Sequence, residues 1–256
     1  MSVIESPRLE DQLANLPENV RRALTDFVDS TRNAFSDDLR SIVLYGSAAE
    51  GRLRRTSDVN LVVVLSKFDH AKAERLRQPL RIAQAAIRLK TMFLLESEIA
   101  PATEAFAVKF GDIARRHRTL HGVDPFAGLK PSRPAAITRL NQTLLNLTLR
   151  SREAYVTRGL REEQLGFVIA DAAGPLRACA AALLELEGAT AASPKEALED
   201  VARAMPQRTE HEWAEVLSLM SAAREEGRLE PGLAGPTVVA LIDLAMSMQA
   251  RARKLS

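Results

Sequence analysis

Two short apolar runs separated by a glycine- and arginine-containing loop most tightly constrain the fold of this chain. The first run is SIVLY, residues 41–45, and the second is VNLVVVL, residues 59–65. Both are rich in β-branched residues and are short for buried helices, so they predict two buried strands. The loop between them carries small and charged residues at Gly46, Ser47, Gly51, Ser57 and Asp58. The sequence therefore predicts a functional loop between two core strands.

Further helices and strands are predicted around these two runs in the first half of the chain. Helical elements are expected where apolar residues recur three or four apart, and strands where short apolar runs occur. In chain order they are a helix over 17–35, a helix over 66–90 with a break or kink at Pro79, a strand over 91–95, a helix over 103–113 and a short strand over 117–126. This order predicts a small mixed α/β unit.

The second half of the chain changes character after a linker, GLKPSRP, at residues 128–134. Apolar residues follow a helical period from there to the end, which is typical of a bundle. Capping residues at Ser193 and Thr209 predict helix starts, and Gly227 predicts a helix end. We therefore expect an α/β plus α architecture. A mixed α/β domain over residues 1–127 would precede a bundle of five helices over residues 128–256.

Composition excludes several classes of protein. The formal net charge is only +2, which argues against extended nucleic-acid binding. The single cysteine, Cys179, rules out an intramolecular disulfide and fits a core position. No apolar run reaches the length of a transmembrane helix, and no signal peptide opens the chain, so we expect a cytoplasmic location and no membrane partner. The sequence leaves open whether the protein forms a homo-oligomer.

The loop between the two predicted strands has the chemistry of a phosphate site. Glycine after a strand lets a phosphate approach the backbone, and the hydroxyl of Ser47 and neighbouring amides can donate to its oxygens. Gly51 permits a second close approach. Asp58 would face the same space from the start of the next strand, and a carboxylate beside a triphosphate suggests Mg²⁺. Residue 60, two positions further on, would point to the same face of the sheet.

This spacing resembles the signature of the DNA polymerase β-type nucleotidyltransferase superfamily. That pattern is Gly-Ser, a second Gly, a short loop and then Ser-Asp-x-Asp before apolar residues; here it reads GSAAEGRLRRTSDVNLVVV. The resemblance covers roughly residues 30–126, including LHGVDPF, and the minimal and kanamycin-type enzymes are the nearest groups. It implies a nucleoside triphosphate as partner, with Mg²⁺. The implied nucleotide-binding residues are Gly46, Ser47, Gly51 and Ser57, and the implied catalytic and metal-binding pair is Asp58 and Asn60.

The sequence departs from the family pattern twice, which predicts a degenerate metal site. Asn60 stands where a second aspartate is expected. The third carboxylate of the family sits on a later strand, and KTMFLL, residues 90–95, offers Thr91 and Met92 in its place. Glu96 and Glu98 follow that strand and are either substitutes for the missing acid or ordinary residues of a helix N-terminus.

Three functions remain open from the sequence. The first is a nucleotidyltransferase-fold protein that binds a nucleoside triphosphate but has weak or lost nucleotidyl transfer. The second is an active nucleotidyltransferase that modifies a small molecule or a protein. The third is a non-catalytic interaction or regulatory module. The base and the acceptor are not defined by the sequence. Each of Arg52, Arg54 and Arg55 is expected to be a solvated loop charge, although as a group they could bind phosphate or an acidic partner. A surface cluster is expected for Arg115, Arg116, His117 and Arg118.

Overall fold

Contacts within the chain divide it into two compact units. The computed structural model describes residues 9–54 and 57–255. The first unit comprises Met1–Ala102 and Ile113–Leu129, and the second comprises Thr103–Asp112 and Lys130–Ser256. The segment Thr103–Asp112 therefore packs with the C-terminal helices, although it lies within the first half of the sequence. The two domains expected over residues 1–127 and 128–256 stay a prediction.

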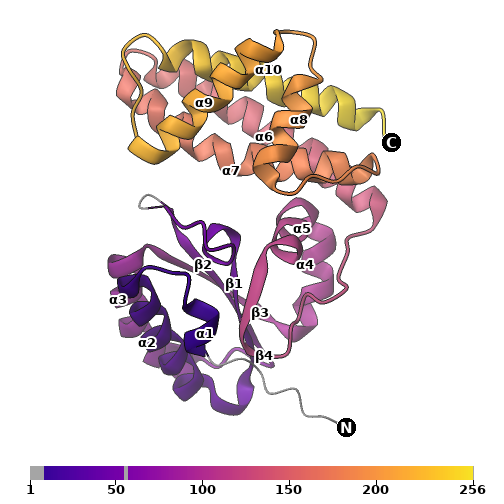
Figure 1. Cartoon of the computed structure of the whole chain (residues 1–256). Coiled ribbons are helices and arrows are strands. Elements are labelled where there is room, and N and C mark those ends of the chain that lie inside the picture. Colours follow the sequence, from indigo (N-terminus) through magenta and orange to yellow (C-terminus); the bar gives the residue numbers. More distant parts are fainter. Residues whose placement is uncertain (1–8, 55–56, 256) are drawn as a thin grey trace. The chain divides into compact units, whose positions relative to one another are not determined.

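The first unit is built on one mixed sheet of four strands (Figure 1). Its strands are β1 (Leu39–Tyr45), β2 (Val59–Leu65), β3 (Leu89–Leu95) and β4 (His117–Gly122). They are arranged in the order β3-β2-β1-β4, with β2 and β3 parallel and the other two pairings antiparallel. The four predicted strands are confirmed. The third begins two residues earlier than expected, which brings Lys90 into it.

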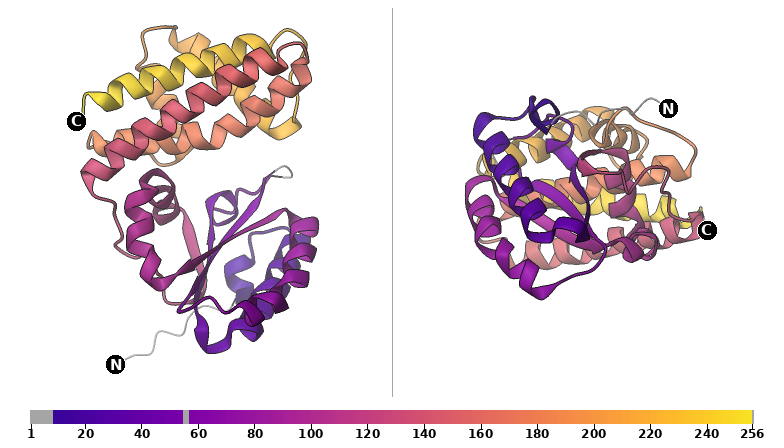
Figure 2. Two further views of the ribbon diagram at one scale, coloured as in Figure 1. Left: turned by 180° about the vertical axis from the view of Figure 1, so that it is seen from behind. Right: turned by 90° about the horizontal axis from the view of Figure 1, so that it is seen from below.

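Helices cover one face of this sheet and bury its alternate residues. These helices are α1 (Leu9–Leu13), α2 (Glu18–Phe35) and α3 (His70–Ile87), and α2 and α3 lie side by side (Figures 1 and 2). Leu61 and Val63 of β2 join Phe27 and Phe35 of α2 in one buried cluster. Val62, which points to the other face, is also fully buried. Burial on both faces explains why the strand sequences are continuous apolar runs.

Helix α3 runs unbroken through Pro79, so the expected break there is wrong. Proline lacks an N–H group and its ring crowds the preceding turn, but neighbouring helix contacts can outweigh that local cost. Helix α7 of the second unit contains Pro175 in the same way. At the other end of α3, Arg88 adopts the left-handed conformation with φ of 53°, and its N–H donates to the Gln84 carbonyl at 3.0 Å.

The second unit is helical. The short η3 (Glu96–Glu98) and α4 (Ile99–Ala105) lead to α5 (Ala107–Arg115), whose Val108 belongs to the buried cluster of the C-terminal helices. The five predicted helices are present after residue 130: α6 (Arg133–Arg158), α7 (Glu162–Leu186), α8 (Pro194–Arg203), α9 (Glu210–Glu226) and α10 (Ala234–Arg253). The predicted caps are also confirmed. Ser193 and Thr209 each accept a backbone N–H, and Gly227 ends α9 with φ of 77°.

Helix α7 forms the centre of this unit. Of the helices in the described ranges, it alone has the length and composition of a membrane span, but half of its most apolar window is buried inside the protein. Cys179 lies on its buried side, where burial raises the pKa of the thiol to about 12. This confirms the expectation that Cys179 is a core residue.

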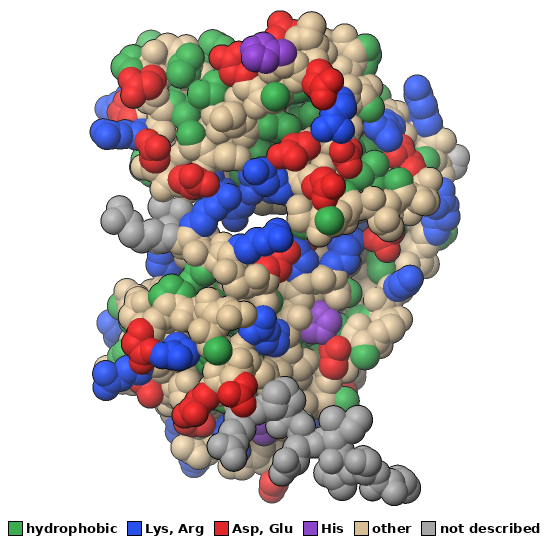
Figure 3. Space-filling model, viewed as in Figure 1, with side chains coloured by type: hydrophobic (Ala, Val, Ile, Leu, Met, Phe, Trp, Pro, Cys, Tyr) green, Lys and Arg blue, Asp and Glu red, His purple; other side chains and the backbone are tan. Residues whose placement is uncertain are grey.

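Charged side chains of both signs are interspersed on the visible outer face of the helical unit (Figure 3).

An ion cluster fixes the end of the sheet opposite to the glycine loop. Asp38, in the short η1 (Ser36–Asp38), accepts from Lys72 at 2.5 Å and from the Ser66 hydroxyl at 3.2 Å. The hydrogen bond from Lys72 is the main reason that the pKa of Asp38 is lowered, and Ser66 and Lys67 add to it. The cluster therefore joins the entry to β1 to the start of α3 through one carboxylate.

The lowered pKa of Asp38 predicts a pH-dependent loss of stability. Its ionised form is favoured in the folded state, so the stabilisation is present above the unfolded pKa, about 4, and fades as pH falls through the folded value. Asp38→Asn should lower the melting temperature at pH 7, and the difference from wild type should shrink below about pH 4. Thermal melts between about pH 3 and 7, a range chosen to include the unfolded pKa of about 4, test this prediction. Asp37→Asn, at an exposed neighbouring aspartate, is the control and should change little. A difference that stays constant with pH would contradict the prediction.

Candidate functional site

Four chain segments meet at one end of the sheet, where β1 ends and β2, β3 and β4 begin; we call this end the sheet edge. The residue pairs at this edge are Tyr45 with Asn60, Asn60 with Lys90, and Tyr45 with His117. Residues paired across neighbouring strands point to the same face, so these four side chains form one row. Gly46 follows directly on β1, and Asp58 directly precedes β2. The fold therefore places the glycine loop and the Asp58-x-Asn60 pair together, as the sequence predicted.

The loop that leaves β1 needs glycine at two positions. Gly46 has φ of 77° and Gly51 has φ of 68°, conformations that residues with a side chain rarely adopt. A Cβ atom on Gly46 would lie 3.9 Å from the Asn60 amide nitrogen, so the loop passes directly over the second member of the pair. The short η2 (Gly46–Ala48) contacts β2. Ser47 is half-buried there, and its carbonyl accepts from Arg52 N–H at 2.8 Å.

Strand β4 braces this loop. Gly46 N–H donates to the Arg116 carbonyl at 2.9 Å. The Arg116 side chain pairs with Glu50 at 3.1 Å, and the Arg118 guanidinium donates to the Ala49 carbonyl at 2.9 Å. These arginines were expected to lie in a surface cluster, and that interpretation is wrong because both are partly buried against the loop. No local sequence pattern indicates this role, since it depends on the pairing of β4 with β1.

The remaining predicted loop residues have local partners. The Ser57 hydroxyl accepts from Arg54 N–H at 3.4 Å, and Ser57 N–H donates to the Arg54 carbonyl at 3.0 Å. These bonds join Ser57 to Arg54, so the Ser57 side chain serves the loop's own geometry. Arg55 lies outside the described residues.

Asp58 is held between two cations from the next strand. Its carboxylate contacts Lys90 Nζ at 2.5 Å and Arg88 Nε at 3.2 Å. The Asp58 side chain is 26% exposed, whereas Lys90 and Arg88 are 68% and 61% exposed. Ion pairs with such exposed partners typically contribute only about 0.2–1 kcal/mol to stability. We call these three residues the Asp58 cluster; one negative and two positive charges give it a net charge of +1.

A lysine of the neighbouring strand β3 lies opposite Asn60. Lys90, not Thr91 or Met92, pairs with Asn60, and Thr91 pairs with Leu61, whose side chain faces the helical core. The expectation that Glu96 or Glu98 could reach the site is also wrong. Both lie past the other end of β3, roughly 20 Å from Lys90, because a strand rises about 3.3 Å per residue. Glu98 accepts the Leu95 N–H at 2.9 Å, as an ordinary helix-start acid does.

The residues of this edge do not fit Mg²⁺. The ion is usually bound by one or two carboxylates together with phosphate oxygens and water. Here Asp58 is already paired with two cations, and Asn60 is an amide that donates to the Asp58 carbonyl at 3.3 Å. In the part of the chain that the structure describes, three or more His, Cys, Asp or Glu side chains nowhere gather as a metal site requires. A divalent cation added to a cluster of charge +1 would be repelled.

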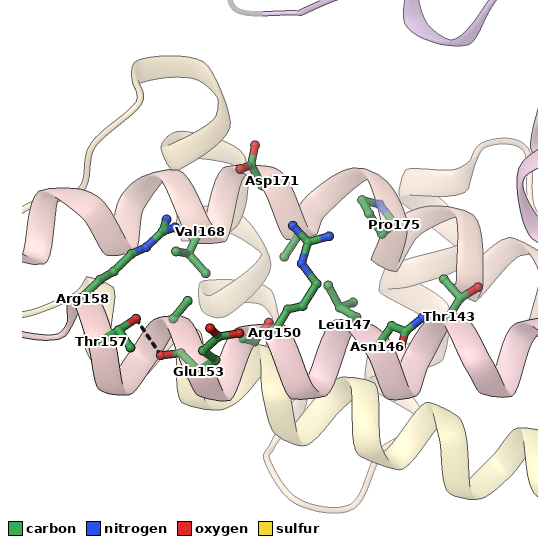
Figure 4. Close-up of a pocket in the computed structure, with 13 residues that line it drawn as sticks. Thr143, Asn146, Leu147, Arg150, Glu153, Thr157, Arg158, Val168, Asp171 and Pro175 are labelled. Carbon is green, nitrogen blue, oxygen red and sulfur yellow. Dashed lines mark hydrogen bonds between the residues drawn. The ribbon is translucent and has the colours of Figure 1, made fainter. Parts of the chain in front are cut away.

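A separate groove lies within the helical unit, between α6 and α7 (Figure 4). It has a volume of about 440 Å³. Arg150, Glu153 and Arg158 of α6 and Asp171 of α7 line it, so it carries charges of both signs. Arg150 extends from α6 toward α7, and the Thr157 hydroxyl donates to the Glu153 carbonyl at 2.8 Å (Figure 4). It shares no residue with the sheet edge.

Comparison with solved structures shows that the chain has the fold of a nucleotidyltransferase. Over 88% of its length, and 98% of the other chain, it superposes with a TM-score of 0.60 and 13% sequence identity. That structure is the spectinomycin adenyltransferase AAD(9) from Enterococcus faecialis, crystallised with ATP and spectinomycin. No protein-family model and no curated protein sequence matches the chain.

The bracing of the glycine loop by β4 predicts local protection from hydrogen exchange. Arg118→Ala should speed amide exchange over residues 46–52, because it removes the side chain that holds the Ala49 carbonyl. Exchange measured by mass spectrometry on peptides from this loop, compared with the strands, tests the prediction. Arg22→Ala, on the exposed side of α2, is the control and should leave the loop unchanged. Equal loop exchange in wild type and Arg118→Ala would show that the arginine does not hold it.

Proposed function

We propose that this protein binds a nucleoside triphosphate at the sheet edge and transfers its nucleotidyl group weakly or not at all. The observation that carries the proposal is that the loop residues stay in place while the acids around Asp58 are replaced. Gly46 and Ser47 follow β1 and pass over Asn60, and glycine at position 46 puts no side chain between the loop backbone and a bound phosphate. The likeness to an adenyltransferase crystallised with ATP supports a nucleotide as ligand.

Loss of catalysis follows from the charges at the edge. Nucleotidyl transfer commonly uses two metal ions held by carboxylates, and an acid that accepts the proton of the attacking hydroxyl. Asp58 is occupied by Lys90 and Arg88, and two other carboxylates near the row, Glu50 and Asp124, contact Arg116 and His117. A lysine side chain supplies hydrogen-bond donors and no acceptor, so Lys90 does not replace the missing acid. Both ring nitrogens of His117 also have partners, the Ile113 carbonyl and the Asp124 carboxylate. With Asp58 and His117 engaged in this way, the site retains binding groups but is not arranged to hold metal ions or to accept a proton.

The alternative of an active enzyme makes a different prediction. An active nucleotidyltransferase would release pyrophosphate from one of the four nucleoside triphosphates, at an ordinary enzymatic rate of about one per second or faster when its acceptor is supplied. We expect wild-type protein to bind at least one nucleotide in titration calorimetry and to release pyrophosphate far more slowly than this, with Mg²⁺ present. Fast release would overturn the proposal of lost transfer.

Acidic side chains introduced at positions 60 and 90 should make nucleotide binding depend on Mg²⁺. In the double variant Asn60→Asp with Lys90→Glu, three carboxylates would lie on one face at the sheet edge, because residues 58, 60 and 90 share it. We expect Mg²⁺ to tighten nucleotide binding by this variant at least about tenfold, as two added carboxylates attract the ion. Asn60→Asp alone should respond less because Lys90 remains.

The control for this experiment is Thr91→Glu with Asn60→Asp. Residue 91 pairs with Leu61 and points to the core face, so an acid there should not contribute to a metal site. Calorimetry with and without Mg²⁺, with melting curves of each variant, gives the answer. If the Lys90→Glu double variant shows no more dependence on Mg²⁺ than wild type, the assignment of residues 60 and 90 to one face of the site is wrong.

A further inference from the structure

We propose that Lys90 and Arg88 take the place of the divalent cation and bind a polyphosphate directly, without metal. The proposal rests on the nucleotide-binding function proposed above and specifies its chemistry. Lys90 supplies a compact positive charge, and Arg88 supplies a planar guanidinium that can donate two parallel hydrogen bonds to phosphate oxygens. Both contact Asp58, which keeps them at the sheet edge beside the glycine loop.

The parallel pairing of β2 and β3 places these cations correctly. Val59 pairs with Leu89, so the residues that precede the two strands, Asp58 and Arg88, lie side by side. Asn60 pairs with Lys90, one step along the same face. A Cβ added to Gly46 would lie 3.9 Å from the Asn60 amide, so the loop and the two cations border the same spot. A phosphate resting on the loop would therefore meet positive charge.

The backbone of Arg88 provides an independent observation. With φ of 53° it occupies the left-handed conformation that ends α3, a position where glycine is the usual residue. A side chain at this position carries a local cost, which glycine would avoid. The Arg88 side chain points to Asp58, and its Nε lies 3.2 Å from the Asp58 carboxylate. Arg88 is one of two described residues other than glycine with positive φ, and the other, Ser36, lies at the far end of β1.

The solvent exposure of Lys90 and Arg88 allows these side chains to exchange Asp58 for a ligand. Lys90 and Arg88 are each more than 60% exposed, so they can turn from Asp58 to a ligand without unfolding the strand. A triphosphate carries more negative charge than one carboxylate and would attract both cations. Asp58 then acts as a positioning residue, because it holds the cations while no phosphate is bound.

Titration calorimetry with ATP and with inorganic tripolyphosphate, in EDTA and in Mg²⁺, tests the proposal. Wild-type protein should bind both ligands in EDTA at least as tightly as in Mg²⁺. Lys90→Met and Arg88→Gly should each weaken binding in EDTA about tenfold or more, the usual loss for a charged hydrogen bond. Arg88→Gly should keep its melting temperature, since glycine suits that backbone conformation.

Lys67→Met is the matched control. Lys67 is 69% exposed and lies 3.8 Å from Asp38, so it is also an exposed lysine beside an aspartate, but at the other end of the sheet. It should change binding less than twofold. Binding that is abolished by EDTA, or that is equal in wild type and Lys90→Met, would overturn the proposal.

The two ligands separate this proposal from the proposed function. If none of the four nucleoside triphosphates binds while tripolyphosphate binds in EDTA through Lys90, the nucleotide function fails and the metal-free polyphosphate site stands. If nucleotides bind only with Mg²⁺, the nucleotide function stands and the metal-free site fails. If neither ligand binds under either condition, both proposals are wrong.

Discussion

The parallel pairing of β2 with β3 is the constraint on which the candidate site depends. Helix α3 connects these strands and allows them to run in the same direction, as crossover helices do. The register that pairs Val59 with Leu89 sets Asp58 beside Arg88 and Asn60 beside Lys90. A shift by one residue would turn Lys90 into the helical core and bring Thr91 to the site. The apolar side chains of β2 and β3 that pack on α2 and α3 oppose such a shift.

The two halves of the site are held by different parts of the fold. Strand β4 positions the glycine loop through the Arg116 carbonyl and the Arg118 side chain, while β3 supplies the charges that surround Asp58. Changes on β3 can therefore alter the charge of the site without disturbing the loop. The glycine loop and the charges around Asp58 are therefore structurally separable parts of the proposed site.

The likeness to AAD(9) spans 88% of the chain at 13% identity. At that level the shared feature is the pattern of buried strands and helices, because a core tolerates many substitutions when its volume and periodicity are kept. Full burial of a large apolar side chain such as Phe27 or Phe35 is worth about 1.5–3 kcal/mol. Each exposed ion pair at the site is worth less. The fold therefore does not depend on whether the edge carries acids or lysine.

The strands, the five C-terminal helices with their caps, and the glycine loop beside Asp58 and Asn60 can all be predicted from the sequence alone. These follow from local rules: apolar period, β-branching, capping residues and the conformational freedom of glycine. The tertiary structure decided the rest. Lys90 begins the run KTMFLL in which an acid was sought, but only its register with Asn60 shows that it, and not Thr91, faces the site. The roles of Arg88, Arg116 and Arg118 rest on contacts between segments distant in sequence, which no local pattern specifies.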